Sequence, residues 1–217
     1  MLNPVVINSR LLLAAIVGLA VMLSRPVTAE DKQAEWRAGL ASVCVTPEGP
    51  IPMCGYNPWM SEGVLDDLYA KAMAIEDAEG GRAVLLTADL LFFRAPMAEA
   101  ICREIMEKTG LERRQILLNA SHTHSGPVFG IKDPDRFELT GDQRATVDAY
   151  TKKLQGQLVH LVEQALADMK PARFRFGTGA VDFVMNRRLM GPDGKCRGMG
   201  PNPHGPVDRS VPVLRVD

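Results

Sequence analysis

The spacing of hydrophobic residues changes several times along the chain, and each change predicts an element. Four short stretches have the alternating or continuous apolar pattern of β-strands, at 36–46, 68–76, 82–89 and 115–120. Between the last two, Met97, Ile101 and Ile105 recur every four residues ahead of Gly110, which predicts an amphipathic helix that ends at this glycine. The continuous apolar run at 115–120 predicts a buried strand. A strand, a helix and a strand in this order predict a βαβ unit with parallel strands.

The rest of the pattern extends this unit into a single sheet. The turn-forming residues 78–81 join the second and third stretches as a hairpin, which we expect at the sheet centre. An apolar stripe over roughly 144–169 predicts a second helix, with His160 on its polar side and Pro171 after its end. Further strands are expected at 172–179, at 181–186 and from 211 onward. The predicted fold class is α/β: a mixed β-sheet with a βαβ unit and flanking helices, cut short at the C-terminus.

The first residues have a different pattern. An uncharged apolar run, 11–23, follows a positive charge, and it is shorter than the roughly 20 residues that a membrane-spanning helix needs. Val27 and Ala29 then fit a signal-peptidase site. We therefore expect residues 1–29 to be a signal peptide and residues 30–217 to be exported, secreted or periplasmic. The alternative is an uncleaved membrane anchor.

Composition narrows the classes of function. The chain has 217 residues, a formal charge of −1 and 46% hydrophobic residues, which is typical of a globular protein. Because binding to phosphates requires a basic excess, we expect no nucleic-acid partner. The four cysteines could pair in three ways in an exported protein, and their spacing does not match a zinc ribbon. Cys102 falls on the apolar face of the first helix and is expected to be buried.

Chemistry-bearing residues come where two predicted strands end. Asp89 closes one strand, and His122 and His124 follow the next. Because parallel strands present their carboxyl ends at one sheet edge, we expect these three side chains near one concave edge. Residues two apart in a strand point to the same face, so both imidazoles could face one centre. Zinc accepts imidazole ligands, and Asp89 could orient one of them from behind. Spacing alone leaves a structural role, in which the histidines cap loop carbonyls, equally open.

A longer motif surrounds the histidines. The sequence NASHTHSGP, residues 119–127, resembles the signature of the neutral/alkaline non-lysosomal ceramidase family. Supporting segments lie in order at 55–77, 84–91 and 185–189, so the resemblance covers nearly all the chain from Ala38. Where the family has two glycines after the motif, this chain has Val128 and Phe129.

This resemblance implies a secreted zinc hydrolase of sphingolipid metabolism that cleaves the N-acyl amide of ceramide to sphingosine and fatty acid. It assigns a zinc ligand to His122 and active-site roles to His124 and Arg187, with Zn²⁺ as cofactor. The substrate would be a lipid or another N-acyl amide, with access from a membrane surface. The other zinc ligands and the reactive serine of the family map beyond residue 217, so we expect a fragment of a longer protein that is inactive alone.

Two alternatives remain open. The first is an exported metallohydrolase that acts on another amide or an ester. The second is a non-catalytic exported α/β binding module in which the H-x-H pair is structural.

Overall fold

The computed structural model describes residues 36–56, 59–130 and 138–217. The predicted signal peptide, 1–29, lies outside these residues. The strands and helices follow one another as β1 (Trp36–Cys44), β2 (Met53–Cys54), β3 (Tyr69–Glu76), β4 (Arg82–Ala88), α2 (Ala95–Thr109), the 3₁₀ turn η1 (Arg113–Gln115), β5 (Ile116–Ala120), β6 (Gly126–Pro127), α3 (Gly141–Ala167), β7 (Lys170–Ala172), β8 (Phe174–Ala180), β9 (Asn186–Met190), β10 (Cys196–Asn202) and β11 (Ser210–Val216).

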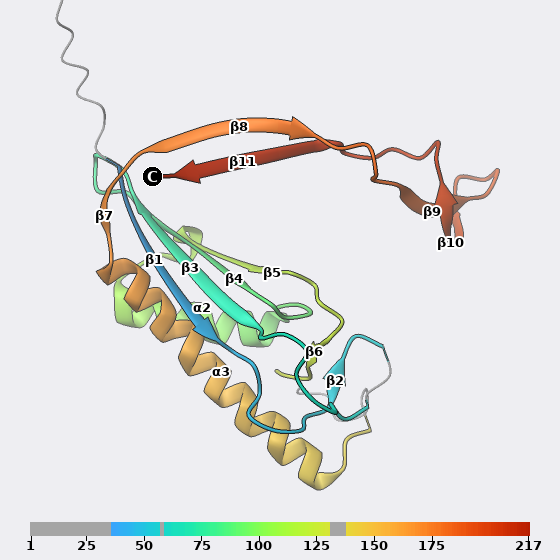
Figure 1. The fold of residues 1–217 in the computed structure, drawn as a ribbon, viewed down its shortest axis with the longest axis horizontal. Coiled ribbons are helices and arrows are strands. Elements are labelled where there is room, and N and C mark those ends of the chain that lie inside the picture. Colours follow the sequence, from blue (N-terminus) through green and yellow to red (C-terminus); the bar gives the residue numbers. More distant parts are fainter. Residues whose placement is uncertain (1–35, 57–58, 131–137) are drawn as a thin grey trace, which may run out of the picture. The chain divides into compact units, whose positions relative to one another are not determined.

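A five-stranded mixed sheet with the strand order β5-β4-β3-β1-β7 carries the fold (Figure 1). β4 and β5 are parallel and are joined through α2, which confirms the predicted βαβ unit. β3 pairs antiparallel with β4 on one side and with β1 on the other, so the predicted hairpin does lie at the sheet centre. The chain is therefore an α/β protein, as its hydrophobic pattern predicts.

The ends of the two helices follow local signals in the sequence. α2 ends at Gly110, which has a φ of 73° and donates its backbone N–H to the carbonyl of Met106, as predicted. α3 begins three residues earlier than the apolar stripe indicates. Thr140 and Gln143 form a reciprocal capping box there, and each side chain accepts a hydrogen bond from the other residue's backbone N–H. The stripe placed this boundary wrongly because a first helical turn needs polar caps rather than apolar residues.

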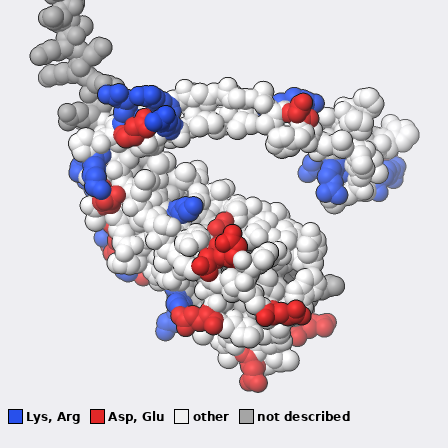
Figure 2. All heavy atoms as spheres, in the orientation of Figure 1, with Lys and Arg blue, Asp and Glu red and all other residues white. Residues whose placement is uncertain are grey.

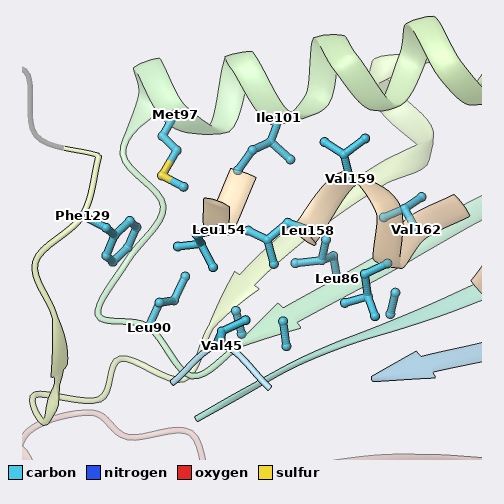
Figure 3. Packing of buried hydrophobic residues seen from close by; sticks show 14 of the residues in the cluster. Val45, Leu86, Leu90, Met97, Ile101, Phe129, Leu154, Leu158, Val159 and Val162 are labelled. Carbon is cyan, nitrogen blue, oxygen red and sulfur yellow. The ribbon is translucent and has the colours of Figure 1, made fainter. Parts of the chain in front are cut away.

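Both helices pack on the same face of the sheet, and the core lies between them and the strands (Figure 3). The strands contribute small and branched residues at alternate positions, and the helices contribute larger aliphatic ones. The fully buried members include Ala70, Ala74, Val84, Leu86, Ile101, Cys102, Ile105, Leu154, Leu158 and Leu161. Within the described ranges, no helix is both long and apolar enough to span a bilayer.

The opposite face of the sheet is not covered by any described helix. Leu40 on β1 is 62% exposed and Leu117 on β5 is 58% exposed. With Met73 and Leu85 they give this face an apolar character, and part of it forms a shallow cavity of about 420 Å³. The prediction that residues 115–120 form a buried strand is therefore wrong for this strand's second face, because an apolar run does not reveal what covers it.

The C-terminal residues form two further strand pairs. β8 pairs antiparallel with β11, and β9 pairs antiparallel with β10. The predicted strand at 181–186 is wrong, since β9 begins only at Asn186. Phe183 is 82% exposed, so the apolar alternation in this segment is not matched by burial. β10 was not predicted, because its sequence CRGMGPN is rich in residues that rarely occur inside strands.

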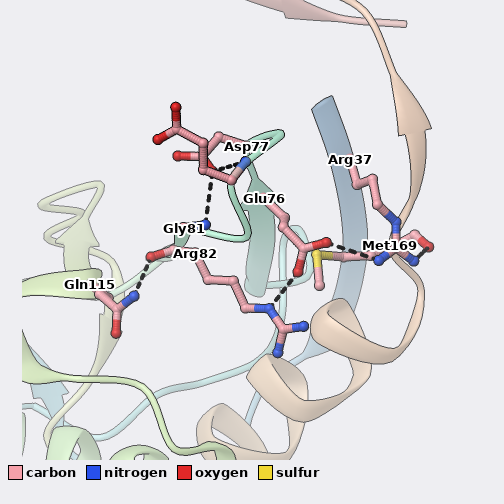
Figure 4. A network of polar contacts seen from close by, with 8 residues as sticks. Arg37, Glu76, Asp77, Gly81, Arg82, Gln115 and Met169 are labelled. Atoms are coloured by element: carbon pink, nitrogen blue, oxygen red, sulfur yellow. Dashed lines mark hydrogen bonds and ion pairs between the residues drawn. The ribbon is translucent and has the colours of Figure 1, made fainter. Parts of the chain in front are cut away.

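One buried carboxylate links three elements at the end of the sheet opposite the histidines (Figure 4). Glu76 on β3, whose side chain is only 11% exposed, binds the guanidinium groups of Arg82 on β4 and of Arg37 on β1, the latter at 3.0 Å. Arg37 also donates to the carbonyl of Met169, just after α3, at 2.9 Å. Hydrogen bonds from Arg82 and then Arg37 hold the pKa of Glu76 below its usual range.

This ion-pair network should make the stability of the fold depend on pH. A lowered folded-state pKa stabilises the fold above the ordinary glutamate value of about 4.3, and this stabilisation is lost as the pH falls through the folded-state value. We therefore expect Glu76→Gln to be clearly less stable than wild type at pH 7, with a smaller difference at pH 3. Urea unfolding at both pH values measures it. The exposed Glu99→Gln is the control, and an equal Glu76→Gln difference at both pH values would contradict the assignment.

Candidate functional site

The two histidines lie in a loop at the carboxyl ends of β4 and β5, which we call the histidine loop, residues 121–125. Ala88 and Ala120 are partners in the parallel register, and the N–H of Ser121 donates to the carbonyl of Ala88 at 3.0 Å. Asp89 follows β4 directly, so it begins at the same edge. The placement of Asp89 and the histidines at one sheet edge, predicted from the βαβ topology, is confirmed.

His122 does not continue the strand. Its φ is 61°, in the left-handed region that non-glycine residues rarely adopt. The prediction that strand alternation places the two imidazoles on one face is therefore wrong. A turn at His122 brings them together instead. Their ring centroids lie 4.9 Å apart with an angle of 75° between the planes. A left-handed non-glycine residue costs on the order of 1–3 kcal/mol, and such strain is often found at functional sites.

The ring of His122 is anchored at one nitrogen. Its Nδ1 lies 2.7 Å from the backbone carbonyl of Leu91, three residues after the end of β4. A carbonyl oxygen can only accept, so in the neutral ring Nδ1 carries the proton and Nε2 keeps its lone pair. A histidine that binds a metal is commonly arranged in this way, with the outer nitrogen donating to a carbonyl or carboxylate.

His124 is held differently. Its Nδ1 is buried and has no hydrogen-bond partner among the residues that the structure describes. Its ring instead lies close to two other rings: that of His122, and that of Tyr56, whose centroid is 4.8 Å away at an angle of 52°. No sequence pattern predicts this contact, because Tyr56 precedes the loop by more than sixty residues and its only local signal is the Gly-Tyr pair within the ceramidase-like segment.

The histidine loop is fixed on its C-terminal side by a short antiparallel pairing. Met53 and Cys54 of β2 are partners of Pro127 and Gly126 of β6. Val128 then donates its N–H to the carbonyl of Pro52 at 2.7 Å. The loop is thus held at both ends, by β5 before it and by β6 after it, which limits the positions that the two imidazoles can take.

Val128 and Phe129, which stand where the ceramidase signature has glycines, point into the core. Their exposed fractions are 0% and 2%. The ring of Phe129 packs on that of Phe92 with centroids 6.1 Å apart. These residues therefore add buried apolar volume beneath the loop, on the side away from solvent.

Asp89 occupies the edge of a large cavity beside the loop. Its Oδ2 accepts a hydrogen bond from the N–H of Tyr69 at 3.0 Å. The cavity has a volume of about 740 Å³, and Thr123 and Ser125 line it from the histidine loop. Its remaining charged lining is acidic and consists of Glu48, Glu62, Asp66 and Asp67. Figure 2 shows several groups of Asp and Glu side chains on this part of the surface. The Nδ1 of His122 contacts the carbonyl of Leu91 rather than the carboxylate of Asp89. A role for Asp89 in orienting a ligand histidine therefore stays a prediction.

Arg187 lies near the start of β9 and is exposed. Figure 2 shows Lys and Arg side chains gathered over β9 and β10. The hydrogen bonds found around it, such as that from Asn186 Nδ2 to the carbonyl of Pro206 at 2.9 Å, stay within the C-terminal segment. Its predicted approach to the two histidines therefore stays a prediction.

The described residues include side chains of the kind that bind zinc. His122 offers a free Nε2 lone pair, and His124 lies beside it, so imidazole donors suited to zinc are present. However, no three His, Cys, Asp or Glu side chains in the described ranges are placed to hold one metal ion together. A catalytic zinc usually has about three protein ligands, so these residues do not complete such a site.

Comparison with known proteins finds no matching family model and no matching curated protein sequence. Solved structures do match. The neutral ceramidase from Pseudomonas aeruginosa superposes with a TM-score of 0.59 at 24% identity, over 71% of this chain and 25% of that chain. The fold is neutral ceramidase-like. A ceramidase complexed with C2 gives a TM-score of 0.63 at 23% identity, over 84% of this chain and 29% of that chain.

The relationship that the histidine motif predicts is thus supported at the level of the fold. The chain spans between a quarter and a third of the length of the two ceramidases that it matches. At this identity the likeness concerns the arrangement of the backbone. The activity of the whole protein, its substrate and its metal are therefore matters for a proposal.

Proposed function

We propose that this chain forms part of an exported zinc-dependent amidohydrolase that cleaves an N-acyl amide, with ceramide as the first candidate substrate. The observation that carries the proposal is the state of His122. At the carboxyl-end edge of the sheet in a neutral ceramidase-like fold, its Nδ1 lies 2.7 Å from the Leu91 carbonyl, and no described residue forms a hydrogen bond with its Nε2. A histidine that only capped a loop carbonyl would not need a left-handed backbone beside a second imidazole.

The residues of this chain would have distinct roles. His122 would supply one zinc ligand of the about three that a catalytic zinc usually has. The metal, when bound, would supply Lewis-acid polarisation of the amide carbonyl. His124, with its ring centroid 4.9 Å from that of His122, would hold a substrate oxygen or move a proton to the departing amine. Arg187 would stabilise developing negative charge, and Asp89 would support the loop from behind.

The experiment that tests this proposal uses the full-length gene product. We expect about one zinc per chain and release of fatty acid from N-acyl sphingoid substrates. A panel of other amides and esters measured in parallel tests for an exported metallohydrolase of different specificity. Zinc without N-acyl hydrolysis would favour that alternative. A protein with neither zinc nor hydrolysis would contradict the proposal and favour a binding module in which the two histidines are structural.

A further inference from the structure

Tyr56 belongs to a group of three rings at the candidate site. Its ring centroid lies 4.8 Å from that of His124, which in turn lies 4.9 Å from that of His122. Both separations fall in the range of about 4.5–7 Å at which aromatic rings attract one another. Tyr56 is 75% exposed, so burial of its own surface does not explain where the ring lies.

The contact with Tyr56 is important because His124 has few other restraints. His122 is oriented by a hydrogen bond from Nδ1 to the Leu91 carbonyl. The corresponding nitrogen of His124 is buried without a partner in the described part of the chain. With no hydrogen bond at Nδ1, the orientation of the His124 ring depends on its contacts with neighbouring rings, and the ring of Tyr56 makes one of these contacts.

The backbone before Tyr56 allows this segment to lie close to His124. Gly55 has a φ of 143°, and a Cβ placed there would lie 2.7 Å from the Cβ of His124 and 2.8 Å from its carbonyl oxygen. Only glycine permits the two segments to come so close. Cys54, one residue earlier, pairs with Gly126 just after the histidine loop. Tyr56 is therefore placed beside His124 by main-chain contacts within the histidine loop and directly after it.

We propose that Tyr56 is the positioning residue for His124, and that its aromatic ring rather than its hydroxyl performs this role. No described residue forms a hydrogen bond with the Tyr56 hydroxyl, whereas the ring contact is direct. The proposal deepens the proposed function, because an oriented His124 imidazole is what proton transfer to an amide leaving group requires. The contact itself is independent of catalysis and can be tested without it.

The first experiment measures the ring contact by NMR of the histidine-labelled chain at one fixed pH. Tyr56→Leu removes the ring current beside His124, so the imidazole resonances of His124 should move more than those of His160 and His204. Tyr56→Phe should leave them close to wild type. Trp59→Leu is the matched control, since Trp59 lies in the same segment and is also exposed, at 55%. Unchanged His124 resonances in Tyr56→Leu would overturn the proposal.

The second experiment measures turnover by the full-length gene product. Tyr56→Leu should lower kcat about tenfold, a part of the roughly 10²–10⁴-fold that a well-placed acid–base group contributes. KM and zinc content should stay within about twofold, because a positioning residue for His124 does not bind the metal, and Tyr56→Phe should restore the rate. An equal loss in Tyr56→Phe would overturn the claim for the ring. If the wild type does not hydrolyse N-acyl amides, the proposed function fails, and the NMR result alone decides the role of Tyr56.

Discussion

Replacing His122 with alanine in the full-length gene product is expected to remove zinc and hydrolytic activity together. His122 is the residue whose free Nε2 suits a metal, and loss of one ligand from a catalytic zinc site removes the Lewis acid on which the reaction depends. Lewis-acid stabilisation is worth several kcal/mol, so the rate should fall by about a thousandfold or more. Metal analysis and an amide-release assay on the same preparation measure both effects.

The controls separate metal loss from misfolding. His122→Gly should be as inactive as His122→Ala but should fold at least as well, because glycine adopts the φ of 61° without strain. His160→Ala should retain full activity, since His160 is exposed on α3, where its ring lies near the carboxylate of Glu163. His124→Ala should keep most of the zinc and lose rate. Full activity or full zinc in His122→Ala would show that His122 is not a ligand.

Gly39→Ala is expected to destabilise the fold more than any other single methyl group added to the sheet. A Cβ at Gly39 on β1 would lie 2.0 Å from the carbonyl oxygen of Ala165 in α3 and 2.8 Å from the backbone nitrogen of Met169. Since these are main-chain atoms, the end of α3 would have to move away from β1. Such overpacking typically costs 1–3 kcal/mol, and we expect about 3 kcal/mol in urea unfolding.

Gly156→Ala on α3 is the matched control for Gly39→Ala. Gly156 is exposed, and a Cβ placed there meets nothing within 4 Å. Alanine should therefore stabilise the chain by about 0.5–1 kcal/mol through helix propensity and a less flexible unfolded state. A Gly39→Ala protein as stable as wild type would show that α3 does not approach β1 as closely as the structure places it.

The sequence by itself determined the elements whose signals are local. The four-residue spacing of Met97, Ile101 and Ile105 fixed α2, and Gly110 fixed its end. The order strand, helix, strand fixed the parallel pairing of β4 and β5 and thereby placed Asp89 and His122 at one edge. Periodicity and connection rules act over short stretches of chain, which is why these parts could be predicted.

For the candidate site, the sequence supplied the motif directly, and it indicated a class of chemistry only through a family resemblance. That resemblance is supported by the fold of two solved ceramidases, while the roles of His124, Arg187 and Asp89 stay predictions. The prediction that the two imidazoles of the H-x-H pair lie close together is correct, but the strand alternation on which it was based is not present. The rings meet because His122 adopts a left-handed turn, and no periodic pattern encodes a single strained residue.

Only the tertiary structure decided the contacts between distant segments. It placed the Leu91 carbonyl on His122, the ring of Tyr56 on His124, and Arg37 and Arg82 on the carboxylate of Glu76. It also left one face of the sheet uncovered by the described helices, although the apolar runs predicted burial. The physical reason is that the chemistry of a side chain determines which kinds of contact it can form. The packing of the whole chain determines which residue lies close enough to form them.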